Sequence, residues 1–157
     1  MHTEQLIHSL SKELSACGAV PVRIGIDLVH IPRIQASLRD FGDRFAQRMF
    51  TAAEAQYANA SPHARAERFA ARFAAKEAAI KAFSLSEAGV DWKDIEVLRQ
   101  ADGSCALLLH GRAREVAAAQ GLTRGLVCLS HDADYAAAVV AALSDKGPGE
   151  GSTEFTT

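Results

Sequence analysis

The sequence predicts an α+β fold in which a mostly antiparallel sheet packs on one long helix. Three observations favour this class. A segment in which apolar and polar residues alternate with the period of a strand occurs near the start of the domain, and two further strands are expected near its end. Segments with helical spacing of apolar residues lie between them. An Asp102-Gly103 pair between two short apolar runs is the signal of a hairpin, which joins antiparallel strands.

Composition limits the class of protein further. The 157 residues suggest one domain, and 48% hydrophobic with 23% charged residues is ordinary for a globular protein with a sizeable core. A net charge of −2 gives no general attraction to nucleic acid. No apolar run reaches the roughly 18 residues of a membrane helix, and the N-terminus does not resemble a secretory signal. We therefore expect a cytoplasmic protein without nucleic-acid or membrane partners.

The three cysteines agree with this location. Cys17, Cys105 and Cys128 are odd in number and have no Cys-x-x-Cys spacing. They fit a reducing compartment better than a disulfide framework or a zinc site, and we expect them to be buried or half-buried.

The chain divides into three expected parts. Residues 1–21 form an N-terminal helical extension, because Leu6, Ile7, Leu10 and Leu14 have helical spacing. Residues 22–145 form the domain. Residues 146–157 are rich in Gly, Ser and Thr without periodicity, and we expect a disordered tail.

The first strand of the domain carries an unusual acid. Apolar residues alternate with Arg23, Gly25 and Asp27 at positions Val22, Ile24, Ile26 and Leu28. This pattern predicts a strand that buries its apolar face and holds Asp27 on the opposite one, where a mid-strand carboxylate is disfavoured. Gly25 leaves Asp27's face open for something to approach. The alternative is an edge-strand Asp that faces water.

Helices follow the first strand. We expect them from Pro32 to about Phe41, from Asp43 through Arg48 after a break at Gly42, and from the Thr51-Ala-Ala-Glu54 capping box to about Asn59. Ser61-Pro62 is then interpreted as the N-cap and first residue of the long helix. Its candidate core residues are Phe69, Phe73, Ile80 and Phe83.

The second half of the domain is mainly strands. After a linker at 84–89 we expect strands at about 94–98 and 106–110 around the hairpin, and a helix over 112–120 that ends at Gly121. Two final strands are expected at 125–130 and 135–143.

The long helix contains the most informative segment, Phe73-Ala-Ala-Lys76-Glu77-Ala-Ala-Ile-Lys81-Ala82. Glu77 and Lys81 are four residues apart and share a helix face. A carboxylate and an ammonium on one face can hold a divalent cation and a phosphate side by side. By itself, the same spacing also fits an ordinary surface salt bridge.

Taken with Gly25-Ile26-Asp27, this segment resembles the signature of the 4′-phosphopantetheinyl transferases of the small holo-[acyl-carrier-protein] synthase type. Arg72-Phe73 before the Lys-Glu pair, and Leu129-Ser130-His131-Asp132 followed by Tyr135, extend the resemblance to about residues 22–143. It implies a ferredoxin-like sheet assembled as a homotrimer, with active sites at protomer interfaces.

The resemblance also implies an activity. Such enzymes transfer 4′-phosphopantetheine from coenzyme A to a serine of an apo acyl carrier protein, in fatty-acid or polyketide biosynthesis, and release 3′,5′-ADP. By resemblance, Asp27 and Glu77 bind Mg²⁺, Glu77 receives the serine proton, and Lys81 neutralises the pyrophosphate. The alternative is a non-catalytic module that binds coenzyme A or a carrier protein within a biosynthetic assembly.

Two further groups of residues are expected to bind the substrates. Arg72, Lys76 and His131, with Lys81, are assigned to coenzyme A phosphates, although solvated or salt-bridged side chains are the alternative. Acyl carrier proteins are acidic, and the complementary surface is assigned to Arg33, Arg39, Arg44, Phe45 and Arg48, with Met49 as a second apolar anchor. Here the alternative is a solvated arginine face.

Overall fold

The structure, a computed structural model, describes residues 20–145, with side chains from Arg23 onwards. The predicted N-terminal helix, Cys17 and the predicted tail lie outside these residues. The described elements are β1 (Val20–His30), α2 (Ile31–Phe41), α3 (Asp43–Met49), α4 (Ala52–Asn59), α5 (Arg65–Ala82), the 3-10 helix η1 (Trp92–Asp94), β2 (Ile95–Arg99), β3 (Cys105–Leu109), α6 (Gly111–Ala119), β4 (Arg124–Asp132) and β5 (Tyr135–Ser144). The predicted α+β class is confirmed.

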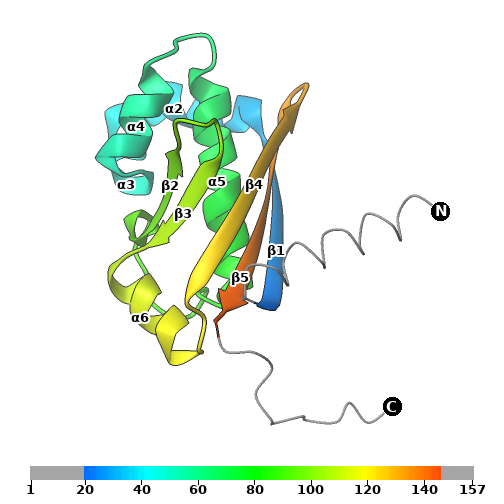
Figure 1. Ribbon diagram of the computed structural model, residues 1–157. Helices are drawn as coiled ribbons and strands as arrows, with labels where there is room; N and C mark the ends of the chain where they lie inside the picture. The colour runs from blue at the N-terminus through cyan, green and yellow to red at the C-terminus, as the bar shows by residue number, and fades with distance from the viewer. Residues whose placement is uncertain (1–19, 146–157) are drawn as a thin grey trace, which may run out of the picture.

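The strands form one sheet in the order β1-β5-β4-β3-β2, and each neighbouring pair is antiparallel. The long helix α5 runs behind this sheet (Figure 1). The first and last strands of the domain are neighbours, with Asp27 opposite Ala138 and Ile26 opposite Val139. The sheet is open, with β1 and β2 at its edges, and its β1–β5 pair joins segments that lie far apart in the sequence.

Small side chains let α5 lie close to the sheet. Six of its alanines are fully buried at 0% exposure: Ala70, Ala74, Ala75, Ala78, Ala79 and Ala82. On β1, a Cβ atom built on Gly25 would stand 2.0 Å from the Ala78 carbonyl oxygen and 2.9 Å from the Ala82 nitrogen. Only glycine fits at so short a distance from another backbone. What approaches Gly25 is therefore the backbone of α5 itself.

The face of β1 that α5 covers differs from the predicted one. The alternation is confirmed, but Ile24, Ile26 and Leu28 are 69%, 63% and 63% exposed, whereas Val29 is buried with Gly25 on the α5 side. The prediction that the aliphatic residues form the core face is wrong for the single chain. Alternation shows which residues share a face, but the tighter backbone contact at Gly25 decides which face the helix covers.

The start of α5 also differs. Residues 62–64 form a turn, and the helix begins at Arg65 after Ala64, which makes no side-chain cap bond. A Ser-Pro pair favours the start of a turn as readily as the start of a helix. The predicted capping box of α4 is confirmed, since the Glu54 nitrogen donates to Thr51 Oγ1 and the Thr51 nitrogen donates to Glu54 Oε2.

The remaining helices occupy the two ends of the molecule. Helices α2, α3 and α4 gather at one end of α5, while α6 lies at the other end beyond β2 and β3 (Figure 1). Phe50 joins the first group to the core, because its ring lies 4.7 Å from that of Phe69 on α5. None of the described helices is long and apolar enough to cross a membrane. Helices α2 and α3 of this group form one wall of the cavity described next.

Candidate active site

Helix α5 and strand β1 meet through Lys81 and Asp27. Lys81 Nζ lies 2.8 Å from Asp27 Oδ1 and donates a second hydrogen bond of 2.9 Å to the Ile26 carbonyl oxygen. The Asp27 side chain is 20% exposed and that of Lys81 is 52% exposed. The pair therefore lies at the border between core and solvent, where other charged groups can reach it.

Glu77 and Asp27 line the same cavity, which has a volume of about 500 Å³. Burial raises the pKa of Glu77 above its ordinary value, and the negative charge of Asp27 raises it further. The positive charges of Lys81 and Arg33 oppose this rise. Two carboxylates thus share one partly desolvated space, which favours either a shared proton or a cation between them.

Helices α2 and α3 and strand β5 complete the cavity wall, together with further residues of α5 and β1. Arg33 and Phe45 line it from α2 and α3, and Phe73 lines it from α5, one turn before Glu77. His30 and Tyr135 also line it, with ring centroids 5.1 Å apart across the β1–β5 pair. The sequence analysis did not select these last two residues, because their pairing depends on the strand register.

The predicted basic surface is only partly gathered at this cavity. Arg33 lines it, while Arg39 lies one residue from its ion-pair partner Asp40, at 2.9 Å. Arg44 and Arg48 are exposed on α3.

The apolar residues of these helices also differ from the predicted arrangement. Met49 is 8% exposed and belongs to the core, so the prediction that it is a second apolar anchor is wrong. The helical spacing of Phe41 with Ile34 and Leu38 predicts an inward position, and this prediction is wrong, since Phe41 is 66% exposed at the end of α2.

Lys76 does not reach any cavity. Its side chain is 0% exposed, and its ammonium pairs with the equally buried Glu54 at 2.8 Å. Burial lowers the pKa of Lys76, and the Glu54 carboxylate opposes this shift. The expectation that Lys76 binds a coenzyme A phosphate is therefore wrong for this conformation, because the ammonium is sealed from solvent. Nothing in the local sequence distinguishes this lysine from an exposed one.

Arg72 and His131 lie at a second cavity of about 330 Å³, whose lining residues are all different from those of the first. Arg68, Arg99 and Ser130 also line it. His131 Nε2 lies 3.4 Å from Glu67 Oε1 at its rim. Arg68 could have been found from its position one turn before Arg72, whereas no sequence signal indicates Arg99.

Arg72 is held in place mainly by an aromatic ring. Its guanidinium lies 4.1 Å from the ring centroid of Tyr57, and Nη1 donates to the Arg68 carbonyl oxygen at 3.2 Å. The residue is 2% exposed, and its Nε is buried without a hydrogen-bond partner. Burial lowers the pKa of this guanidinium. A buried donor without an acceptor is costly, so the site suits an anionic ligand that would supply one.

The spacing on α5 explains why the two cavities are separate. Arg72 and Glu77 are five residues apart, about 1.4 turns, and therefore point to different sides of the helix. Asp27, Glu77, Lys81, Arg33 and Phe45 are brought together, and Arg72 joins His131 elsewhere. A single chain holds two groups of predicted site residues on two sides of one helix.

Comparison with known proteins gives consistent results. The family model described as the 4′-phosphopantetheinyl transferase superfamily matches residues 23–140. A holo-[acyl-carrier-protein] synthase of Koribacter versatilis is 47% identical over 117 residues, which are 74% of this chain and 93% of that protein. One from Gloeobacter violaceus is 45% identical over 121 residues, covering 77% of this chain and 92% of that protein.

A solved structure agrees with this relationship. The Helicobacter pylori holo-[acyl-carrier-protein] synthase in complex with coenzyme A superimposes with a TM-score of 0.66 at 27% identity. The match covers 77% of this chain and 99% of that one.

Proposed function

The chain belongs to the 4′-phosphopantetheinyl transferase superfamily, and from this premise we propose that Asp27, Glu77 and Lys81 form its reaction centre. The enzyme transfers the 4′-phosphopantetheine group of coenzyme A to a serine of an apo acyl carrier protein. The products are the holo carrier protein and 3′,5′-ADP. One observation carries the assignment. The carboxylates of Asp27 and Glu77, from separate elements, line one cavity, and the ammonium of Lys81 forms a hydrogen bond with Asp27.

The proposed metal is Mg²⁺, held by Asp27 and Glu77. Both supply oxygen donors, and the repulsion that raises the pKa of Glu77 is the kind that a cation relieves. Among residues 20–145 no group of three or more His, Cys, Asp or Glu is arranged to hold a metal. This agrees with Mg²⁺, which needs only one or two carboxylates when water and substrate phosphates complete its ligands. When bound, the ion neutralises charge on the pyrophosphate.

The side chains then divide the remaining work. The serine oxygen forms a bond to the phosphorus of the phosphopantetheine arm, and the bond from that phosphorus to the 3′,5′-ADP oxygen breaks. Glu77 takes the serine proton, because it is the carboxylate of the long helix that lines the reaction cavity. Lys81, whose ammonium is half-exposed, neutralises the departing phosphate.

Coenzyme A phosphate binding is proposed at the second cavity. Arg72 and His131 were assigned to it from the sequence, and Arg68 and Arg99 line the same space. The buried Nε of Arg72 supplies a donor aimed at no protein acceptor. A phosphate there would bind to both a fixed guanidinium and exposed cations.

A homotrimer would explain how the two cavities act together. The face of the sheet opposite α5 is apolar and exposed: Ile24, Ile26, Leu28, Leu126 and Val139. Exposed patches of this kind on a sheet with an open edge strand favour self-association. In such an assembly the second cavity of one protomer can adjoin the first cavity of the next. Mixing inactive Asp27→Asn and Arg72→Glu proteins should then restore part of the activity. If each active site were formed within one protomer, the mixture would stay inactive.

The carrier protein is proposed to dock beside the first cavity. Arg33 lines the cavity, Phe45 offers an apolar contact there, and Phe41, Arg44 and Arg48 are exposed on the same pair of helices. An acidic helix of the carrier would meet positive charge and an aromatic anchor next to its reacting serine. The pathway of the carrier protein, fatty-acid or polyketide biosynthesis, stays a prediction. The cytoplasmic location of the enzyme is also a prediction.

The testing experiment is intact-protein mass spectrometry of an apo acyl carrier protein with this enzyme, coenzyme A and Mg²⁺. The expected result is a mass gain of one phosphopantetheine, which disappears with a chelator and with Glu77→Ala. A mass gain that persists with the chelator would contradict the proposed dependence on Mg²⁺. Coenzyme A binding with no gain for any carrier would favour a binding module.

A further inference from the structure

A buried ion pair between Glu54 on α4 and Lys76 on α5 has no role in the chemistry described so far. Both side chains are 0% exposed, and Lys76 Nζ lies 2.8 Å from Glu54 Oε2. Lys76 directly precedes Glu77 in the chain. We propose that this pair is a positioning device, which fixes α5 against α4 and β2 so that Glu77 and Lys81 face Asp27.

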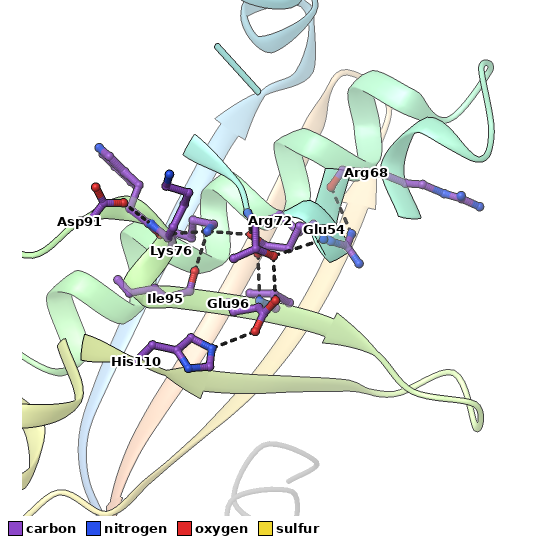
Figure 2. Close-up of polar contacts among 12 residues, drawn as sticks. Glu54, Arg68, Arg72, Lys76, Asp91, Ile95, Glu96 and His110 are labelled. Atoms are coloured by element: carbon purple, nitrogen blue, oxygen red, sulfur yellow. Dashed lines mark hydrogen bonds and ion pairs between the residues drawn. The ribbon is translucent and has the colours of Figure 1, made fainter. Parts of the chain in front are cut away.

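Every polar group of the pair is used. The ammonium has three hydrogens, and it donates to Glu54, to the Trp92 carbonyl oxygen at 2.9 Å and to the Ile95 carbonyl oxygen at 2.5 Å. Glu54 also accepts from the Val97 nitrogen at 2.9 Å and from the Thr51 nitrogen at 2.9 Å. Figure 2 shows Lys76 between Glu54 and Ile95, with Glu96 and His110 beyond. The pair therefore connects α4, α5, η1 and β2 at one point.

Stability alone does not account for these charges. Removing two ions from water is costly, and an apolar pair of similar volume is often as stable or more stable. Hydrogen bonds from an ammonium and a carboxylate do add direction, which apolar contacts lack. With three acceptors around Lys76 and three donors around Glu54, α5 can neither turn nor slide without breaking several bonds.

The same network reaches the wall of the reaction cavity. The carbonyl oxygen of Trp92 accepts a hydrogen bond from Lys76. The indole ring of the same residue stacks on Phe73, with ring centroids 5.3 Å apart and planes at 19°. Phe73 lines the cavity together with Glu77. On the other side, the Gly25 contact holds α5 against β1. Helix α5 is thus held from two sides, and displacing a reacting group by 1 Å can cost about 10²-fold in rate.

The inference rests on the proposed roles of Asp27, Glu77 and Lys81. The first variant that tests it is Glu54→Asp, which keeps the charge but shortens the side chain by one methylene. The matched control is Glu96→Asp, whose carboxylate bonds Thr51 Oγ1 and His110 Nε2 but makes no hydrogen bond to α5. We expect kcat to fall about 10-fold or more in Glu54→Asp, with the KM for coenzyme A within about twofold of the parent. The control should keep the parental kcat.

A second variant separates position from stability. In Glu54→Gln with Lys76→Met both charges are gone, while Gln keeps an acceptor for the Val97 nitrogen. We expect a folded protein with a melting temperature near that of the parent and a kcat as low as in Glu54→Asp. Trp92 is the sole tryptophan of the chain, so its emission maximum and its quenching by acrylamide report whether η1 and Phe73 have moved. We expect both to change in the two variants and not in the control.

The outcomes separate this inference from the proposed function. Parental kcat in a folded double variant would overturn it, as would equal losses in Glu54→Asp and Glu96→Asp. If neither Glu54 variant folds, the pair is a stability element and the inference fails. Glu77→Gln is measured in parallel: if it retains turnover, the proposed role of Glu77 fails instead.

Discussion

Lys81 Nζ and Asp27 Oδ1 lie 2.8 Å apart, although the two residues are separated by 54 positions in the chain. The same ammonium binds the Ile26 carbonyl oxygen, so the tip of one side chain holds both the side chain and the backbone of β1. Because Lys81 is 52% exposed, a phosphate oxygen can compete with Asp27 for it. This contact joins the two sequence motifs into one reaction centre.

Replacing Asp27 by Asn should lower the transfer rate by about 10²-fold or more. The carboxylate supplies a proposed metal ligand and the partner of Lys81. The ion pair with Lys81 lies at the border between core and solvent, where water screens it, so the melting temperature should change less than the rate. Mass spectrometry of the carrier gives the rate and circular dichroism the fold. Glu115→Gln, which alters an exposed acid on α6, is the control, and a parental rate in Asp27→Asn would contradict the assignment.

Glu77→Gln should stabilise the metal-free protein at neutral pH. Burial and Asp27 raise the pKa of Glu77 in the folded state, so its ionised form is disfavoured there and destabilises the fold above that pKa. Neutral Gln lacks this penalty. The advantage should shrink as the pH falls through the folded pKa and vanish below the unfolded pKa, where both residues are uncharged. Melting temperatures in chelator from pH 4 to pH 8 measure it, and a gain that grows on acidification would have the wrong sign.

Gly25→Ala should destabilise the protein by about 3 kcal/mol, because the new methyl group would lie 2.0 Å from a backbone oxygen of α5. Backbone atoms cannot move aside without shifting the helix. Gly125→Ala is the matched control, since its methyl group would meet the Leu107 side chain at 2.7 Å and the Phe83 ring at 3.1 Å. Side chains adjust more easily, so the control should lose less. Urea unfolding compares the two, and equal losses would refute this account.

Ile26→Asp should dissociate the proposed trimer and lower turnover with it. Ile26 is 63% exposed in the centre of the apolar face of the sheet, beside Val139 on β5. A charge there would be buried without a partner in an assembly. Light scattering after size-exclusion chromatography measures the mass. Phe41→Asp, at a similarly exposed residue on α2, should leave the mass unchanged. A parent protein that is monomeric at working concentration would refute the trimer.

Arg33→Glu should weaken carrier-protein turnover and leave coenzyme A binding nearly intact. Arg33 lines the reaction cavity from α2, whereas Arg39 is paired with Asp40. Reversing a charge at a docking surface mainly slows association, so the effect should decrease at high salt. Arg39→Glu serves as the comparison and should have a smaller effect. Loss of coenzyme A binding in Arg33→Glu, measured by calorimetry, would exclude a docking role.

Local signals predicted most of the fold. The capping box at Thr51, the break at Gly42 and the hairpin at Asp102 act over a few residues, and each is confirmed. The predicted start of α5 was wrong, because Ser61-Pro62 suits a turn as well as the start of a helix. Cys128 was expected to be at least half-buried, but it is exposed in the single chain, on the same face as Ile26.

The site was predicted unevenly for a similar reason. Asp27, Glu77 and Lys81 could be selected because their order and spacing follow a recognisable pattern. The structure places Asp27 and Glu77 at one cavity and Lys81 in contact with Asp27. Lys76 was misassigned, since its neighbours in sequence say nothing about Glu54, its partner in space. His30 and Tyr135 were missed because only the register of β1 against β5 brings them together.

The sequence by itself determined which chemical groups are available to this protein. These are a carboxylate in the first strand, Asp27, and a carboxylate and an ammonium on one helix face, Glu77 and Lys81. The alternation of residues also gives β1 two unlike faces. The tertiary structure alone decided which face of β1 meets α5, and that Lys76 is sealed while Lys81 is open. The physical reason is that spacing along a chain fixes which residues point the same way, whereas burial depends on what packs against them. For β1 that packing includes the close contact between Gly25 and the backbone of α5, and for Lys76 it includes the buried Glu54.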